Sequence, residues 1–143
     1  MRQINEATLA LAKSFESCKL TAYQDQVGVW TIGWGHTGKD VYEGCTMTQE
    51  EADTTLLDDL QKTARGVEAC VKVPISDNQF GALVSFAFNV GLGNLEKSTL
   101  LKLLNEGDFH GASLQFQMWD HAGGVTVPGL LRRRTAEVQL FLT

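Results

Sequence analysis

Residues 16–38 read ESCKLTAYQDQVGVWTIGWGHTG, and the interpretation of the whole chain starts from this stretch. It contains one Glu, one Asp and one His among short strand-like runs that glycine interrupts. The residues before it, TLALAKSF (8–15), have helical periodicity, and no helical period resumes until about Thr48. The stretch therefore predicts a small antiparallel sheet between two helices.

Two carboxyl groups in this stretch stand in contrasting surroundings. Glu16 ends the first helix beside Phe15, where the negative end of the helix dipole and an apolar neighbour both favour the protonated form. Asp25 lies in a polar, turn-forming segment (23–28), which favours the ionised form. Such a pair is typical of enzymes that cleave glycosidic bonds. The alternative from these residues alone is a solvated helix end and an ordinary turn.

Thr31 is the third candidate catalytic residue. It follows Asp25 on the expected return strand, where its hydroxyl group can hold a water molecule beside the carboxylate. If water is the nucleophile, the two carboxyl groups should lie roughly 6.5 to 9.5 Å apart and the anomeric configuration should invert.

The order of these residues is similar to that of a known family. Glu16, Asp25 and Thr31, followed by Ile-Gly-Trp-Gly-His (32–36), resemble the phage-type lysozymes, endolysins of glycoside hydrolase family 24. The family pattern is Glu, eight residues, Asp, five residues, Thr and then Ile-Gly-x-Gly-His, which these positions match. The resemblance continues in chain order through the following segments: 78–91, 93–101, Trp119, 123–124, 128–130 and 133–137.

The resemblance implies a mostly helical α+β protein with the lysozyme-like fold. Residues 1–143 would form one domain, with a small β-sheet lobe at about 16–50 and a connecting helix at about 48–70. A helical lobe would comprise about 71–143 and the N-terminal helix, and an active-site cleft would lie between the lobes.

The activity implied is that of a muramidase, which hydrolyses the β-1,4 bond between N-acetylmuramic acid and N-acetylglucosamine in peptidoglycan and so lyses the host. Glu16 would protonate the leaving oxygen, Asp25 would stabilise the oxocarbenium-like centre and help to activate water, and Thr31 would position that water. Neither a cofactor nor a metal ion is expected, because no His, Cys and Asp cluster has ligand spacing.

Four further residues are candidates for substrate binding. Trp34 can stack on a sugar ring or belong to the core, and we place it near the cleft. Thr37 lies on the same stretch. The resemblance puts Phe88 and Asn89 on the cleft wall, whereas Asn89 at a helix end can equally bond to the backbone.

His36 is expected to be structural, because Asp25 already supplies a base. In the family pattern the matching His pairs with an Asp on the next helix, which falls here on Asp59. This pair would form an acid-sensitive link between the lobes.

Local signals mark the later helices. Residues 48–51 form a capping box before a helix of about twenty residues, and residues 76–79 cap a helix that is apolar on nearly every side. Helices near 98–106 and 108–121 and a loop at 123–128 follow, and 129–142 closes the domain.

Three consecutive arginines, Arg132, Arg133 and Arg134, admit three interpretations. They can contact the anionic envelope as a patch; Arg133 can pair with Glu137 at i,i+4; or one arginine can face Glu16. The net charge of −5, from 12 basic and 17 acidic residues, argues against nucleic-acid binding, which needs a broad basic face.

The N-terminal residues 1–15 carry charges within their apolar region, so they indicate neither a signal peptide nor a signal-anchor. No run approaches the length of a transmembrane segment. We expect a monomer held in the host cytoplasm until it is released to the periplasm and cell wall. Cys18, Cys45 and Cys70 fit no zinc site or disulfide framework and are expected to be reduced thiols, with a redox role for Cys18 as the alternative.

Other classes of function remain open at this point. The chain can be a wall-binding module without turnover, or it can disrupt membranes through its Arg-bearing C-terminal helix. Among enzymes, a lytic transglycosylase would release an anhydro product instead of adding water. Glu16, Asp25 and Thr31 together favour the hydrolase.

Overall fold

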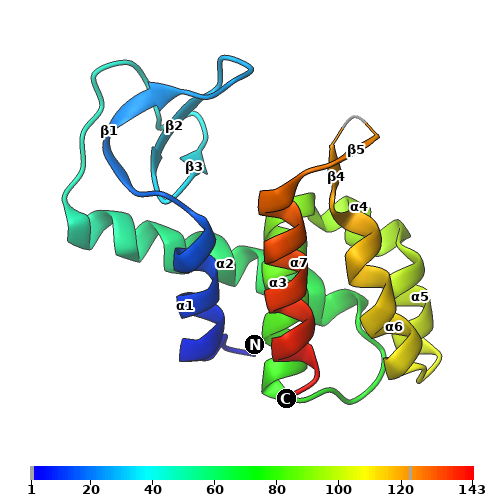
Figure 1. Ribbon diagram of the computed structural model, residues 1–143. Coiled ribbons are helices and arrows are strands. Elements are labelled where there is room, and N and C mark those ends of the chain that lie inside the picture. Colours follow the sequence, from blue (N-terminus) through cyan, green and yellow to red (C-terminus); the bar gives the residue numbers. More distant parts are fainter. Residues whose placement is uncertain (1, 123) are drawn as a thin grey trace.

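The computed structural model describes residues 2–122 and 124–143, which form a small sheet lobe and a larger helical lobe joined by one long helix (Figure 1). The helices and strands in chain order are α1 (Glu6–Phe15), β1 (Lys19–Gln24), β2 (Trp30–Gly33), β3 (His36–Thr37), α2 (Gln49–Cys70), α3 (Asp77–Val90), α4 (Leu92–Lys97), α5 (Thr99–Asn105), α6 (Phe109–Gln115), the 3₁₀ helix η1 (Phe116–Trp119), β4 (His121–Ala122), β5 (Val125–Thr126) and α7 (Pro128–Phe141).

The predicted antiparallel sheet is confirmed, with strand order β1-β2-β3. Thr31 on β2 lies opposite Tyr23 on one side and Thr37 on the other. The turn between β1 and β2 is closed by hydrogen bonds between Asp25 and Val29, and Gly28 adopts the positive φ of 86° that this turn needs. This topology places Asp25 at the tip of the hairpin and Thr31 in the middle of the sheet.

The long connecting helix begins where the capping box predicts. The Thr48 hydroxyl accepts the backbone N–H of Glu51, and the Glu51 carboxylate accepts that of Thr48. From this cap α2 runs beneath the sheet lobe into the helical lobe (Figure 1). Its apolar stripe is buried as expected, with the residues Ala52, Leu56, Leu60, Ala64 and Val67.

Helix α3 forms the centre of the helical lobe, as its all-round apolar sequence predicts. Helices α1, α2, α4 and α7 pack against it (Figure 1), and residues 80–87 are buried. A set of aromatic rings packs on it: Phe116 and Trp119 meet the Phe86 ring edge-on, with centroids 5.4 and 5.6 Å away. The core that supports the site therefore belongs mainly to this lobe.

The C-terminal part differs from prediction in three places. The expected helix 108–121 ends as α6 at Gln115 and continues as η1, because the three-residue repeat of a 3₁₀ helix lets Phe116 and Trp119 both reach Phe86. The expected loop 123–128 holds the second strand of a β4–β5 hairpin, and Gly123 lies outside the described residues. Helix α4 was not predicted.

The three cysteines are free thiols, as expected. Among the described residues, no helix combines the length and the apolar character that crossing a membrane requires. Over 2–122 and 124–143, no three His, Cys, Asp or Glu side chains lie together as a metal site would need.

Candidate active site

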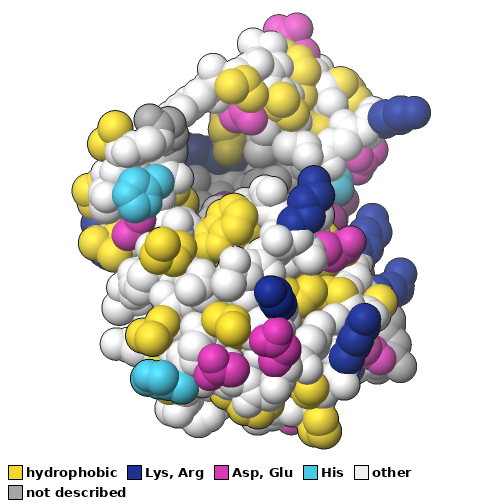
Figure 2. Space-filling model, turned by 90° about the vertical axis from the view of Figure 1, so that its right-hand side faces the viewer, with side chains coloured by type: hydrophobic (Ala, Val, Ile, Leu, Met, Phe, Trp, Pro, Cys, Tyr) yellow, Lys and Arg dark blue, Asp and Glu magenta, His cyan; other side chains and the backbone are white. Residues whose placement is uncertain are grey.

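The surface is hollowed between the sheet lobe and the helical lobe (Figure 2). A cavity of about 530 Å³ is lined by residues of both lobes. The cavity is lined by Glu16, Gly35, Thr37, Asp59, Lys62, Thr63, Ala87, Phe88, Asn89, Gly91 and Leu92. A second cavity, of about 410 Å³, is lined by residues of α1 and α7 and of the segment before α7, and Glu16 and Asn89 line both. Glu16 therefore stands in the wall between two adjoining cavities.

Glu16 is fixed from three directions. Its backbone N–H donates to the carbonyl of Ala12 at the end of α1, over 3.1 Å. The Arg133 guanidinium donates to Glu16 Oε1 over 2.9 Å, and the carboxylate side chain is 24% exposed. At Gly35, whose φ is 93°, an added Cβ would lie only 3.4 Å from Glu16 Oε2. The carboxylate thus faces solvent on one side while α1, α7 and the β2–β3 turn hold the other.

The structure adds a neighbour of Glu16 that the helix end and Phe15 did not indicate, because the Arg133 guanidinium lies against its carboxylate. Of the three interpretations of the arginine run, the one that places an arginine against Glu16 is confirmed. The pairing of Arg133 with Glu137 is confirmed as well, at 3.4 Å.

The envelope-binding interpretation was wrong for two of the three arginines. Arg133 is 3% exposed and Arg134 0%, because α7 packs their guanidinium groups against α3. Arg134 Nε lies 2.7 Å from Oε1 of the fully buried Glu137, whose Oε2 accepts the hydroxyl of Ser85 over 2.6 Å. Burial raises the pKa of Glu137 and lowers that of Arg134, while their ion pair acts in the opposite direction on both. Arg132 alone of the run is exposed.

Asp25 and Thr31 are tied to one another through Val29. Asp25 Oδ1 accepts the backbone N–H groups of Val27 and Val29, each over 2.9 Å. The Thr31 hydroxyl donates to the Val29 carbonyl over 3.0 Å, and Thr31 is only 5% exposed. Neither residue lines the two cavities at Glu16. However, the cross-strand neighbour of Thr31 is Thr37, which does line the larger cavity.

Trp34 lies against the core and does not line either cavity. Its indole N–H donates to Asp53 Oδ1 over 2.8 Å. The ammonium group of Lys13 lies 5.6 Å from the ring centroid and 3.6 Å from the same Asp53 oxygen. The hydrogen bond from Trp34, followed by one from Gln49, lowers the pKa of Asp53. Trp34 thus fixes the β2–β3 turn to α1 and α2.

His36 lies between two carboxylates. Its Nδ1 is 2.8 Å from Asp59, as the family pattern implied, and its Nε2 is 3.0 Å from Asp40, which the sequence analysis missed although it lies four residues away. Burial lowers the pKa of His36, but the hydrogen bonds and charges of Asp59 and Asp40 outweigh it, so the net shift is upward. Protonation of the His36 imidazole therefore strengthens its contact with Asp59, which links β3 to α2.

Comparison with known proteins bears on this geometry. The model of the family described as phage lysozyme matches residues 13–137. The chain belongs to the phage lysozyme family. Among its relatives is an endolysin of Bacillus phage B103, 44% identical over 98% of this chain, and the chain spans about half (54%) of that relative's length.

Two other proteins that resemble this chain are matched over nearly their whole length. The endolysin of Acyrthosiphon pisum secondary endosymbiont phage 1 is 42% identical, with 96% of this chain and 97% of the relative covered. Among solved structures, the muramidase domain of SpmX from Asticaccaulis excentricus superposes with a TM-score of 0.93 at 38% identity, covering 100% of this chain and 99% of that one. The lysozyme-like fold predicted from the sequence is thereby confirmed.

Sequence reasoning missed several lining residues of this phage lysozyme family member. Lys62 and Thr63 lie one turn along α2 from Asp59, so the helical spacing of the predicted helix would have placed them beside it. Gly35 carries no reactive group, and its role as a close neighbour of Glu16 follows only from the turn geometry. Chemically, the residues that line the larger cavity supply two carboxyl groups, two hydroxyls, an ammonium group, an amide and an aromatic ring.

Proposed function

We propose that this chain is a muramidase that hydrolyses the β-1,4 bond between N-acetylmuramic acid and N-acetylglucosamine in peptidoglycan, with water as nucleophile and inversion at the anomeric carbon. The observation that carries the proposal is the position of Glu16 between two adjoining cavities. A polysaccharide that fills both cavities presents a glycosidic bond to this carboxyl group. Membership of the phage lysozyme family and the muramidase domain among the structural neighbours support the same reaction.

In this proposal Glu16 protonates the leaving oxygen. Arg133 holds its carboxyl group in place, and a bound strand would cover the exposed part of the side chain and displace water from it. Asp25 stabilises the oxocarbenium-like centre and helps to activate the water that Thr31 positions. The pairing of Thr31 with the cavity residue Thr37 supports this placement.

Three of the four candidate binding residues line the larger cavity. These three would contact the sugars directly: Thr37 through its hydroxyl, Phe88 through its aromatic face and Asn89 through its amide. Trp34 would not contact the sugars. Its indole N–H donates a hydrogen bond to Asp53, and this contact would keep the adjoining Gly35 close to Glu16.

The products of digestion test the reaction. Purified peptidoglycan is digested, the released muropeptides are weighed by mass spectrometry, and the first-formed anomer is followed by NMR. The expected products have gained one water and appear first as the α anomer, because a β bond has been inverted. Anhydro products would instead identify a transglycosylase. Tight wall binding without products would identify a binding module, and vesicle leakage without products a membrane-disrupting protein.

Lysis of the host would follow once the protein reaches the wall. Its location before that moment, expected to be the host cytoplasm, stays a prediction that fractionation of infected cells can test. The monomeric state also stays a prediction. Sedimentation at working concentration should give the mass of one chain, and a dimer mass would contradict it.

A further inference from the structure

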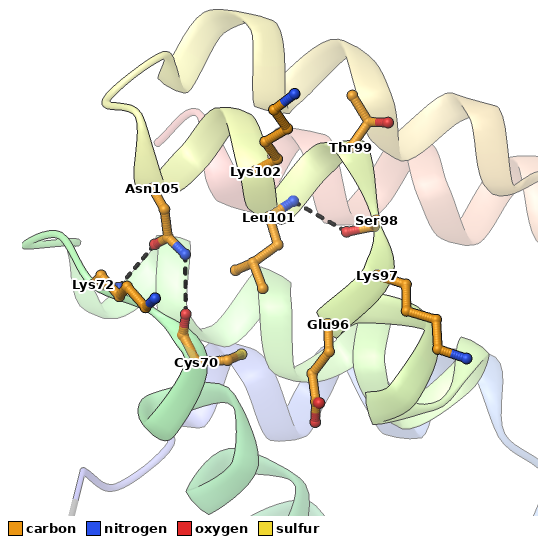
Figure 3. Close-up of a pocket in the computed structure, with 9 residues that line it drawn as sticks. All are labelled: Cys70, Lys72, Glu96, Lys97, Ser98, Thr99, Leu101, Lys102 and Asn105. Atoms are coloured by element: carbon orange, nitrogen blue, oxygen red, sulfur yellow. Dashed lines mark hydrogen bonds between the residues drawn. The ribbon is translucent and has the colours of Figure 1, made fainter.

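Two features of the helical lobe lie outside the cavities at Glu16. One is a third cavity, of about 450 Å³, between the end of α2 and the corner formed by α4 and α5 (Figure 3). The ammonium ends of Lys97 and Lys102 extend away from this cavity and from each other, so these lysines do not gather around one ligand. The other feature is the fully buried Glu137 with the two arginines beside it, where charged groups do converge. The proposed muramidase reaction leaves Glu137 without a role.

The three nitrogen atoms of the Arg133 guanidinium meet three different residues. Nε donates to Glu137 Oε2 over 3.4 Å, and Nη2 donates to the backbone carbonyl and the hydroxyl of Ser85 over 3.3 and 3.4 Å. Nη1 donates to Glu16 Oε1 over 2.9 Å. Because the guanidinium is a rigid planar fork, the contacts of Nε and Nη2 fix the direction in which Nη1 points. Glu137 and Ser85 therefore direct Arg133 towards Glu16.

Glu137 is itself fixed in the core of the helical lobe. Its Oε2 accepts the hydroxyl of Ser85 over 2.6 Å, and Arg134 Nε lies 2.7 Å from its Oε1. Arg134 is also fully buried, and its guanidinium carbon lies 5.1 Å from the centroid of the Phe86 ring. Side chains locked in this way by packing and hydrogen bonds can hold a functional group in one orientation. The orientation of Arg133 is thus set from within the α3–α7 contact.

The two oxygen atoms of the Glu16 carboxyl group have different surroundings. Oε1 accepts from Arg133, and a guanidinium has only N–H donors, so this oxygen remains an acceptor as long as the contact lasts. Oε2 lies on the side of Gly35, where an added Cβ would be 3.4 Å away. Gly35 lines the larger cavity. The oxygen that is left to carry a proton therefore lies on the side of the cavity that the sugars would occupy.

We propose that Glu137 and Ser85 are positioning residues for the proposed catalytic acid, Glu16. They direct Arg133 to Oε1 and thereby leave the transferable proton on Oε2. The proposal rests on the proposed muramidase function. During cleavage this proton passes from Oε2 to the glycosidic oxygen, which keeps the electron pair of the broken bond, while the attacking water gives its proton to Asp25. Neither Glu137 nor Ser85 lines a cavity at Glu16, so both act through Arg133 and not on the sugars.

The kinetics of Ser85→Ala test this proposal, with Ser113→Ala as the matched control. Ser113 is likewise buried in the helical lobe, at 4% exposure, but its hydroxyl donates to the carbonyl of His110 over 2.6 Å and lies outside the charge network. Initial rates on soluble peptidoglycan fragments give kcat and KM, and circular dichroism at the assay temperature confirms folding. Ser85→Ala should lower kcat about threefold to tenfold and keep KM within about twofold, because a misdirected acid slows the chemical step alone. Ser113→Ala should keep both constants at the wild-type values.

Arg133→Met separates positioning from a general loss of packing. It removes the guanidinium through which Ser85 acts, so adding Ser85→Ala in this background should change kcat by less than about twofold. Glu137→Gln is a second and stronger perturbation. Both carboxylate oxygens face N–H or O–H groups, whereas an amide can accept through only one of its two atoms. In the folded Glu137→Gln variant, kcat should fall about tenfold to a hundredfold with little change in KM.

Nitrogen-15 NMR of the Arg133 side chain follows its orientation without turnover. In the wild type, rotation about the Nε–Cζ bond should be slow enough to give separate Nη signals, and Ser85→Ala should speed it. Wild-type kcat in Ser85→Ala, or the same loss of kcat with and without Arg133, would overturn the proposal. A wild type that cleaves no peptidoglycan would refute the muramidase, and the arginine spectra would still decide whether Ser85 holds Arg133.

Discussion

Replacing Arg133 by methionine tests the buried charge network behind Glu16. The Arg133 guanidinium contacts Glu16 at 2.9 Å and Glu137 at 3.4 Å, and it donates to the carbonyl of Ser85 over 3.3 Å. Methionine fills much of the same volume but carries no charge. The fully buried Glu137 would then keep Arg134 as its remaining cation among these residues.

The expected cost follows from this geometry. Removing one partner from a buried ionic cluster costs about 3 to 5 kcal/mol, because the remaining charge stays buried without full compensation. This is a large part of the roughly 5 to 15 kcal/mol that stabilises a domain of ordinary size. At about 3 °C per kcal/mol, the melting temperature should fall by about 10 to 15 °C.

Thermal unfolding followed by circular dichroism measures the effect, with Arg132→Met as the matched control. Arg132 lies one position away on the same helix but is exposed, so its replacement should change the free energy of unfolding by less than about 0.5 kcal/mol. If both variants had melting temperatures close to that of the wild type, the network would not be the buried cluster described above.

Two further predictions concern the sheet link and the helix packing. Because the pKa of His36 is raised above 6.5 in the folded protein, the stability that its charge contributes is fully present below pH 6.5 and is lost as pH rises through the folded value. In urea unfolding, His36→Asn should therefore lose most stability relative to wild type below pH 6.5, and a pH-independent difference would contradict the ionic link. At Gly81 an added Cβ would lie 2.0 Å from the Thr8 hydroxyl, so Gly81→Ala should cost about 1 to 3 kcal/mol. At Gly93 a Cβ meets nothing within 4 Å, so Gly93→Ala serves as the control, and equal stability of both variants would refute the close packing.

The features that the sequence predicted best are determined by residues that lie close together along the chain. The capping boxes at Thr48 and Ser76 involve side chains three residues apart, so the starts of α2 and α3 could be placed closely. The buried stripe of α2 follows from helical spacing alone. The strands of the β4–β5 hairpin have only two residues each, too few for an alternating pattern, and were missed for that reason.

The features that sequence did not predict depend on packing between distant segments. A run of three arginines is typical of a solvated face, yet Arg133 and Arg134 are buried because Glu137 and Ser85 offer oxygen atoms at the α3–α7 contact. Trp34 was expected near the cleft. Its hydrogen bond to Asp53 could not be predicted, because it depends on how α2 lies under the sheet. Asp25 and Thr31 were proposed from their local surroundings and from the family pattern, whereas their shared contact with Val29 required the structure.

The most direct test of the central claim is the rate of peptidoglycan cleavage by Glu16→Gln beside Glu43→Gln. Glutamine keeps the shape of Glu16 and can still contact Arg133, but it cannot donate the proton. Glu43 lies exposed in the sheet lobe and lines neither cavity at Glu16. With both variants folded by circular dichroism, Glu16→Gln should lose about a hundredfold to ten-thousandfold in rate while Glu43→Gln keeps the wild-type rate. Equal rates in the two variants would show that Glu16 is not the acid and that the catalytic site lies elsewhere.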